Sequence, residues 1–381
     1  MLAGAPILQF GTGRFLQAHV DLFVSQALPL GQALGGIAVV QNTDSAQSST
    51  RLSALSAAQG YPVRLRGLRD GAAIDEVVQV TSVRAAWHAG RDWARLLEAM
   101  ASQVQVIVSN TADQGYALDS ADGAQALAMT GAPPRSYPAR LAVLLWHRWR
   151  QVPDAPMTLC PCELVGRNGD TLREIVVAVA SGWGAPAGFI AYLREHCVWV
   201  NSLVDRIVSE PLHPAGAIAE PYALWAIECR PRMVLPCSHP AIVLTDDLAG
   251  FERLKLWLLN LAHSFLAECW LVDGRPAGET VLEAMHDLAL RERLEDVWRD
   301  EVLPVFDVLG QGEAARSYLE GLRERLLNPF LAHRLSDIAQ HHAQKKRRRF
   351  EPVIAAAARA GLTIRQPCLR RALTEVDDTA P

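Results

Sequence analysis

Short apolar runs alternate with helix-length segments along the N-terminal part of the chain. Strand-like stretches occur at Ile7–Phe10, Gly36–Val40, Tyr61–Leu68, Glu76–Val83, Val104–Val108 and Met157–Leu164. Apolar residues recur with helical spacing at Phe15–Leu28, Trp93–Ala101 and Ala139–Arg150. Strands that alternate with helices are typical of a parallel sheet covered on both faces. The pattern therefore predicts an α/β fold that begins with a Rossmann-type doubly wound sheet.

Beyond about residue 246 the strand pattern gives way to helical periodicity. Helices are expected at Phe251–Cys269, Glu279–Leu294, Ala314–Leu327, Pro329–Ala343 and Val353–Ala360. Because single cores stop growing at about 250–300 residues, the 381 residues of the chain are expected to form two domains. We expect a nucleotide-binding domain over residues 1–240 and a mainly α-helical substrate-binding and catalytic domain over residues 241–381.

Composition excludes several classes of protein. The net charge of −4 gives no field that would attract nucleic acid, and no apolar run reaches the ~18 residues of a membrane span. No basic segment precedes the first apolar run, as a signal peptide requires. The seven cysteines lack the spacing of a zinc site. We expect a cytoplasmic protein with reduced thiols, no metal, no nucleic-acid or membrane partner, and a monomeric or homodimeric state.

A glycine-containing turn follows the first strand and indicates a nucleotide site. The turn consists of Gly11, Thr12, Gly13, Arg14 and Phe15. In dinucleotide-binding folds the first glycine permits the tight turn and the second lets the backbone approach a pyrophosphate at a helix N-terminus. Arg14 adds a guanidinium that can pair with phosphate. The third position of the fingerprint is Leu16, so a plain strand-to-helix connection is the alternative.

Two further segments are candidates for cofactor contact. Asp44, which lies beyond the second strand, is the candidate partner of a ribose 2′-hydroxyl, and we therefore favour NAD, with NADP as the alternative. Ser109, Asn110 and Thr111 end a strongly apolar strand. Ligands approach parallel sheets at this edge, so these residues are expected on the nicotinamide side, unless they form only a strand-ending cap.

The strongest chemical signal is a polar stripe on the very apolar segment 251–269. In an α-helix Lys255 and His263 lie about 80° apart, and Asn260 lies about 60° from His263. A stripe that faces water is the alternative interpretation. If the stripe faces a cleft, a desolvated lysine has a pKa lowered toward neutrality and can exchange the proton of an alcohol. Asn260 can donate to the developing alkoxide, and His263 can orient the substrate hydroxyls.

Two other routes to alcohol oxidation lack their residues. Short-chain reductases place a lysine four residues after a catalytic tyrosine, and no tyrosine here is followed by one. Zinc alcohol dehydrogenases need cysteine and histidine ligands around an open metal position, and no such set is evident. The lysine is therefore the best candidate for the proton-transfer group.

Taken together, these motifs resemble the polyol-specific long-chain dehydrogenase/reductase family, within which tagaturonate and fructuronate reductases are most similar. The hallmark Lys-x4-Asn-x2-His is matched by Lys255, Asn260 and His263. Further matches are Gln9–Leu16, Ser109–Thr111, Pro161–Leu164, Asn168–Asp170, Asn201–Ile207, Glu220–Tyr222, Asn328–Phe330 and Lys345. They span almost the whole chain.

The resemblance implies roles and a substrate class. It implies that Lys255 is the general acid/base and that Asn260 and Asn168 bind the reacting oxygen. The implied substrate-binding residues are His333, Lys345, Arg349, Asp205 and Arg206. A hexuronate/aldonate pair (tagaturonate/altronate or fructuronate/mannonate) is the first expectation, and mannitol, arabinitol or a related polyol is the alternative. A non-catalytic NAD-binding protein is a second alternative.

Overall fold

The computed structural model describes residues 4–42, 48–111, 115–128 and 132–374. The chain divides into two compact units. The first contains Met1–Leu65 and Glu76–Leu248, and the second contains Arg66–Asp75 and Ala249–Pro381. The boundary lies near Leu248, whereas the sequence predicted one at residue 240. The sequence did not indicate that the short segment 66–75 groups with the helical unit.

The first unit is built on a six-stranded sheet with the strand order β5-β2-β1-β6-β7-β8. The strands are β1 (Ile7–Phe10), β2 (Ile37–Gln41), β5 (Val83–His88), β6 (Val106–Ser109), β7 (Met157–Pro161) and β8 (Cys197–Trp199). All of them pair in parallel. This is the strand order of the dinucleotide-binding Rossmann fold, in which ligands bind where the order reverses, here between β1 and β6. The expected doubly wound sheet is confirmed.

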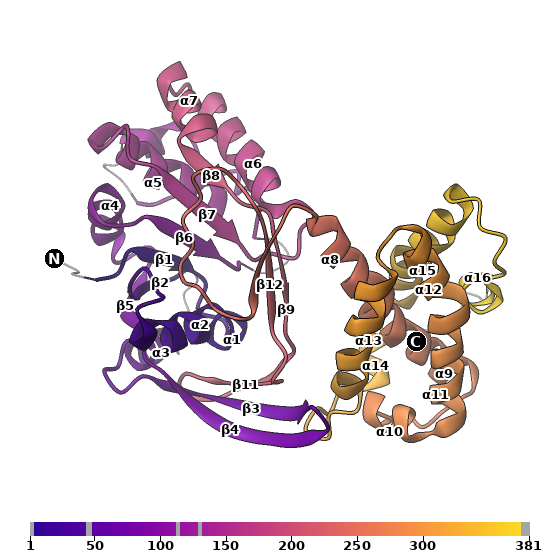
Figure 1. Cartoon of the computed structure of the whole chain (residues 1–381). Coiled ribbons are helices and arrows are strands. Elements are labelled where there is room, and N and C mark those ends of the chain that lie inside the picture. Colours follow the sequence, from indigo (N-terminus) through magenta and orange to yellow (C-terminus); the bar gives the residue numbers. More distant parts are fainter. Residues whose placement is uncertain (1–3, 43–47, 112–114, 129–131, 375–381) are drawn as a thin grey trace. The chain divides into compact units, whose positions relative to one another are not determined.

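Both faces of this sheet are covered. One core joins the sheet to α4 (Trp93–Ser102), α5 (Tyr137–Gln151), α6 (Asn168–Gly182) and α7 (Ala187–Glu195). Figure 1 shows these helices together on one side. A second core lies on the opposite face and includes α2 (Val20–Ala27) and β12 (Leu224–Glu228). Strands buried on both faces explain why β1 and β2 are mostly apolar and show no alternation of apolar and polar residues.

The other strands of the described residues form two smaller sheets. One has the order β10-β11-β3-β4, with β3 (Tyr61–Arg69), β4 (Ala72–Val80), β10 (Val208–Pro211) and β11 (Ala217–Ala219). The other has the order β13-β12-β9, with β9 (Ser202–Asp205) and β13 (Ile242–Thr245). The expected strand Tyr61–Leu68 corresponds to β3. The expected strand Glu76–Val83 covers the second half of β4 and ends at the first residue of β5.

In the described part of the second unit the regular elements are helices, apart from its part of the β3–β4 hairpin (Figure 1). Its helices include α8 (Leu248–Leu254), a π-helical segment η3 (Lys255–Asn260), α9 (Leu261–Val272), α10 (Val281–His286) and α11 (Leu288–Asp296). A second π-helical segment η4 (Val297–Val302) leads into α12 (Leu303–Val308), and α13 (Gly312–Leu326), α14 (Leu335–Ile338), α15 (His342–Arg359) and α16 (Pro367–Thr374) follow. Their apolar faces share one buried core.

Several expected helices have different bounds. The expected helix Phe15–Leu28 is split into α1 (Arg14–Gln17) and α2. The expected helix Pro329–Ala343 is wrong over most of its length, because only α14 and the first two residues of α15 are helical there. Conversely, α15 continues through Pro352, where a proline normally interrupts a helix. Among the described residues, no helix has both the length and the apolar character that a membrane crossing needs.

Candidate active site

The carboxyl ends of three adjacent strands bring the glycine turn and the Ser109–Thr111 segment together. Gly11, Asn110 and Cys162 directly follow β1, β6 and β7. The backbone ladder continues past the strand ends: the Asn110 N–H donates to the Phe10 carbonyl at 3.0 Å, and the Cys162 N–H donates to that of Ser109 at 2.7 Å. The glycine turn and the Ser109–Thr111 segment therefore lie side by side at the point where the strand order reverses.

The two glycines of the turn have different physical reasons to be glycine. Gly11 has φ +123°, and a Cβ there would meet the Asn110 carbonyl oxygen at 2.5 Å, so the fold itself requires glycine. Gly13 has φ −72°, and a Cβ there would meet nothing within 4 Å. Its missing side chain leaves open space over the turn, as a closely approaching ligand needs.

The remaining residues of the turn differ in how far they are exposed. Thr12 is buried, and its carbonyl accepts a hydrogen bond from the Gln17 side chain at 2.8 Å. Arg14 and Phe15 open the short helix α1, with the Arg14 side chain exposed. Asp44, the predicted ribose partner, lies outside the described residues.

The central residue of this edge is Glu163, which lies in the matched segment Pro161–Leu164 but was not predicted as a site residue. Its side chain is 4% exposed. One carboxylate oxygen accepts hydrogen bonds from the Thr111 N–H and hydroxyl, both at 3.0 Å. The other oxygen accepts from the hydroxyls of Ser109 at 3.1 Å and Tyr116 at 3.2 Å. A carboxylate offers about four acceptor positions, and those of Glu163 face donors that hold the segment following β6.

The pKa of Glu163 and the donors around it are consistent with a structural role for its carboxylate. Burial raises the pKa of its carboxyl group, and hydrogen bonds from Ser109 and Thr111 partly oppose that rise. Four donors directed at one carboxyl group favour its ionised form, which accepts and does not donate. Its position two residues beyond the buried strand β7, which matches that of Thr111 beyond β6, was the available sequence signal.

Asn168 was predicted to bind the reacting oxygen, but its side chain is already fully engaged. It is 1% exposed. Its amide nitrogen donates to the carbonyls of Pro161, Glu163 and Ser202, at 3.0–3.1 Å. Its amide oxygen accepts from the N–H groups of Gly169 and Ser202. This geometry makes Asn168 a residue that fixes the turn after β7, and it argues against the predicted contact with the reacting oxygen.

Arg206 is likewise engaged within the first unit. The guanidinium is 8% exposed and donates to the backbone carbonyls of Glu220 and Ala18. It ties the end of β9 to the N-terminal helices, so the predicted substrate contact competes with existing bonds. Asp205, at the end of β9, is buried and lies opposite Leu224 in the neighbouring strand.

Lys255 and Asn260 begin and end the π-helical segment of the second unit. The Leu261 N–H, at its end, donates to the Leu256 carbonyl five residues back, which is the hydrogen-bond spacing of a π-helix. Both side chains are half-buried. Within the described residues the Asn260 side-chain amide makes no hydrogen bond, in contrast to that of Asn168. Asn260 therefore has both donors and its acceptor available.

Two histidines and a lysine lie near this segment. His263, in α9, packs edge-on against His333, with ring centroids 4.9 Å apart. Burial lowers the pKa of His333, and the charge of Lys345 lowers it further against the opposing effect of Asp337. The Lys345 ammonium donates to the Ile338 carbonyl at 2.8 Å, which leaves donors for another acceptor. Burial and the neighbouring Arg349 lower the pKa of Lys345.

Arg349 reaches the same segment from α15. One guanidinium nitrogen donates to the Asn260 carbonyl at 3.1 Å and to the Ser264 hydroxyl at 2.7 Å. The structure thus brings the predicted residues Asn260, His263, His333, Lys345 and Arg349 together within the second unit. The last two of these residues belong to the basic run Lys345–Arg349, whose most buried member is Lys346, at 5% exposure.

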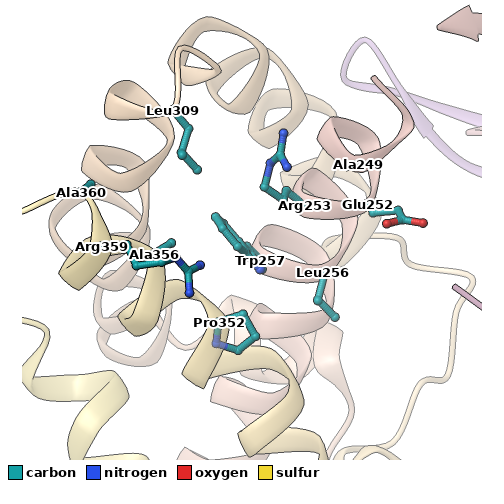
Figure 2. A pocket seen from close by; sticks show the side chains of 10 residues that line it. All are labelled: Ala249, Glu252, Arg253, Leu256, Trp257, Leu309, Pro352, Ala356, Arg359 and Ala360. Atoms are coloured by element: carbon teal, nitrogen blue, oxygen red, sulfur yellow. The ribbon is translucent and has the colours of Figure 1, made fainter. Parts of the chain in front are cut away.

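A pocket of about 520 Å³ also lies in the second unit (Figure 2). Trp257, Leu256 and Arg253 from one helical segment face Pro352 and Arg359 of α15 across it. None of the predicted site residues lines this pocket. We place the candidate chemistry at Lys255 and Asn260 because the polar groups gather there, whereas the pocket is mainly apolar.

The sequence matches two family models. Residues 5–234 match the model described as the mannitol dehydrogenase Rossmann domain, and residues 247–372 match the mannitol dehydrogenase C-terminal domain. Curated relatives include an altronate oxidoreductase of Halalkalibacterium halodurans, 31% identical, with 91% of this chain and 69% of the relative covered. Another altronate oxidoreductase, from Bacillus subtilis, is 29% identical, with coverages of 91% and 74%.

Two solved structures share the fold. D-sorbitol dehydrogenase in substrate-free form superposes with a TM-score of 0.76 at 18% identity, covering 95% of this chain and 78% of that one. Pseudomonas fluorescens mannitol 2-dehydrogenase, in ternary complex with NAD and D-mannitol, gives a TM-score of 0.70 at 18% identity, with coverages of 99% and 85%. At these identities the likeness concerns the arrangement of the backbone.

Proposed function

This chain belongs to the mannitol dehydrogenase family, and we propose that it is an NAD-dependent oxidoreductase that interconverts a hexuronate and the corresponding aldonate. The observation that carries the proposal is the unengaged Asn260 amide at one end of a π-helical segment that begins with Lys255. The family and the Rossmann sheet make it an oxidoreductase that acts on CH–OH groups.

The residues at the carboxyl edge of the sheet fit a dinucleotide. The open space above Gly13 suits a pyrophosphate, and Arg14, exposed beside it, adds positive charge. The Ser109–Thr111 segment, held by Glu163, forms the edge on which the nicotinamide would rest. The bound cofactor supplies or accepts the hydride, and the protein supplies orientation and electrostatics.

Residues of the second unit would transfer the proton and stabilise the developing charge. We assign to Lys255 the transfer of the hydroxyl proton, because an ammonium both donates a proton and stabilises an alkoxide. The Asn260 amide donates to the same oxygen, and His263, packed on His333, orients the neighbouring hydroxyls. Asn168 acts in this scheme by fixing the turn after β7.

An anionic substrate fits the cations around this segment. Lys345 retains donors beyond its bond to Ile338, and a carboxylate would satisfy them with a charge-assisted hydrogen bond. Two of the curated relatives are named for altronate, which is an aldonate. We therefore assign the substrate carboxylate to Lys345, with His333 beside it.

The test is turnover of NADH with tagaturonate and fructuronate, alongside neutral ketoses of the same length. Lys255→Met should remove most turnover, by about 100-fold or more, with unchanged circular dichroism and thermal midpoint. Lys345→Met should raise KM for the uronates and leave neutral ketoses unaffected, whereas Arg348→Met, an exposed cation of the same helix, should change neither. A Lys255→Met variant with near-normal kcat would refute the mechanism, and preference for neutral ketoses would refute the substrate assignment.

A further inference from the structure

The π-helical segment changes which side chains of this helix share a face. In a regular α-helix Lys255 and Asn260 would lie about 140° apart, since each residue turns about 100°. A π-turn accommodates one extra residue, which reduces this angle by about 100°, to roughly 40°. His263, three α-helical residues beyond Asn260, then lies within about 20° of Lys255. The three residues occupy an arc of about 60° instead of about 140°.

Arg349 is the side chain that holds the end of this segment. Its guanidinium donates to the Asn260 carbonyl and the Ser264 hydroxyl through one nitrogen. The carbonyl belongs to the last residue of the π-turn, and the hydroxyl belongs to the first full turn of α9. The guanidinium therefore spans the junction where the helix returns to α-helical spacing. Burial, with a smaller effect of Arg348, lowers the pKa of Arg349 to about 10.

A buried ionic cluster fixes α15 with respect to α9. The Glu268 carboxylate, on α9, accepts hydrogen bonds from the Lys346 ammonium at 2.9 Å and from the His342 ring at 2.7 Å. The Glu268 and Lys346 side chains are 8% and 6% exposed. Because Lys346 precedes Arg349 by about one helical turn, this second link limits how far the guanidinium can move from Asn260.

We propose that Arg349 is a positioning residue that holds the π-turn in which Lys255 and Asn260 share one face. This inference rests on the proposed function, in which those two side chains act on one oxygen. It assigns Arg349 a task different from the substrate binding that the family resemblance implied. The predicted consequence concerns the rate of the chemical step for every substrate, whatever its charge.

The experiment compares Arg349→Met and Arg349→Lys with the exposed control Arg348→Met. Displacement of reacting groups by about 1 Å costs about 100-fold in rate. Arg349→Met should therefore lower kcat by about that factor for uronates and neutral ketoses alike, with little change in KM. Arg349→Lys keeps one donor for the carbonyl and should recover part of kcat. Raised KM for uronates alone, with normal kcat, would overturn the proposal and make Arg349 a carboxylate ligand.

A second measurement is independent of turnover. Hydrogen exchange of the Leu261 amide, which closes the π-turn, should accelerate in Arg349→Met and stay at the wild-type rate in Arg348→Met. Exchange in the other π-helical segment, Val297–Val302, should not change and reports that the fold is intact. Unchanged Leu261 exchange in a folded Arg349→Met variant would overturn the proposal even if the substrate were misassigned. Faster exchange in a protein inactive on every uronate would support it while refuting the proposed function.

Discussion

The two asparagines of the candidate site differ in what their side chains still offer to a ligand. Asn168 uses its amide for five hydrogen bonds to neighbouring backbone, whereas that of Asn260 is unengaged among the described residues. Asn260→Ala should therefore lower kcat by about 10²–10³, the usual cost of one oxyanion donor, at unchanged stability. Asn168→Ala should instead lower the free energy of unfolding by about 1–3 kcal/mol for each buried group left unsatisfied. Urea unfolding and kcat measured on both variants check this, and the reverse pattern would contradict it.

Gly11 and Gly13 also allow a comparison of two single-residue variants, one expected to affect the fold and the other the cofactor. Gly11→Ala places a Cβ against the Asn110 carbonyl at a positive φ, so the variant should lose stability. Gly13→Ala places its Cβ in open space at an ordinary φ of −72°, so it should unfold like the wild type. If a pyrophosphate approaches there, Gly13→Ala should raise the Kd for NADH by about tenfold or more. Fluorescence titration with NADH measures this, and an unchanged Kd would show that the cofactor lies elsewhere.

At the scale of elements, Glu163 joins the segment after β6 to the one after β7. Glu163→Gln replaces an acceptor oxygen by a donor that faces other donors, so the Ser109–Thr111 segment should loosen and NADH affinity should fall.

The pH dependence of the free energy of unfolding should also differ between Glu163→Gln and the wild type. Because folding raises the pKa of this carboxyl above 4.5, the folded protein binds the proton more tightly than the unfolded chain. Its contribution to stability therefore declines as pH rises from about 4.5 through the raised pKa. Unfolding measured across this window should show that slope in the wild type and not in Glu163→Gln, and parallel slopes would contradict the assignment.

Elements were predictable where local pattern and burial agree. The strand Ile7–Phe10 was placed with its observed bounds, because all four residues are buried and a turn follows at once. The π-turn was not predictable, since Lys255 lies between Leu254 and the apolar run Leu256–Leu259 and periodicity does not reveal one inserted residue. The continuation of α15 through Pro352 depends on packing against the rest of the helical unit. Asn168 and Glu163 show the same limit for the site. Only the fold decides which polar side chains form hydrogen bonds that fix the local structure and which stay available to a ligand.

The molecule as a whole contains separate cores for its two units. The clusters that include Phe10 and Phe23 belong to the first unit, and the cluster that includes Trp298 and Phe350 belongs to the second. Separate cores favour departure from two-state unfolding. NADH at about 100 times its Kd stabilises the species that binds it by about 2.7 kcal/mol. Hydrogen exchange of peptides along a urea series gives the urea concentration at which each unit is half unfolded. NADH should therefore raise this midpoint more for peptides of the first unit than for peptides of the second. The Gly13→Ala variant should lose this shift while it keeps both midpoints, because the substitution acts on the cofactor alone. A single midpoint shared by all peptides, moved equally by NADH, would mean that the two cores unfold as one cooperative unit.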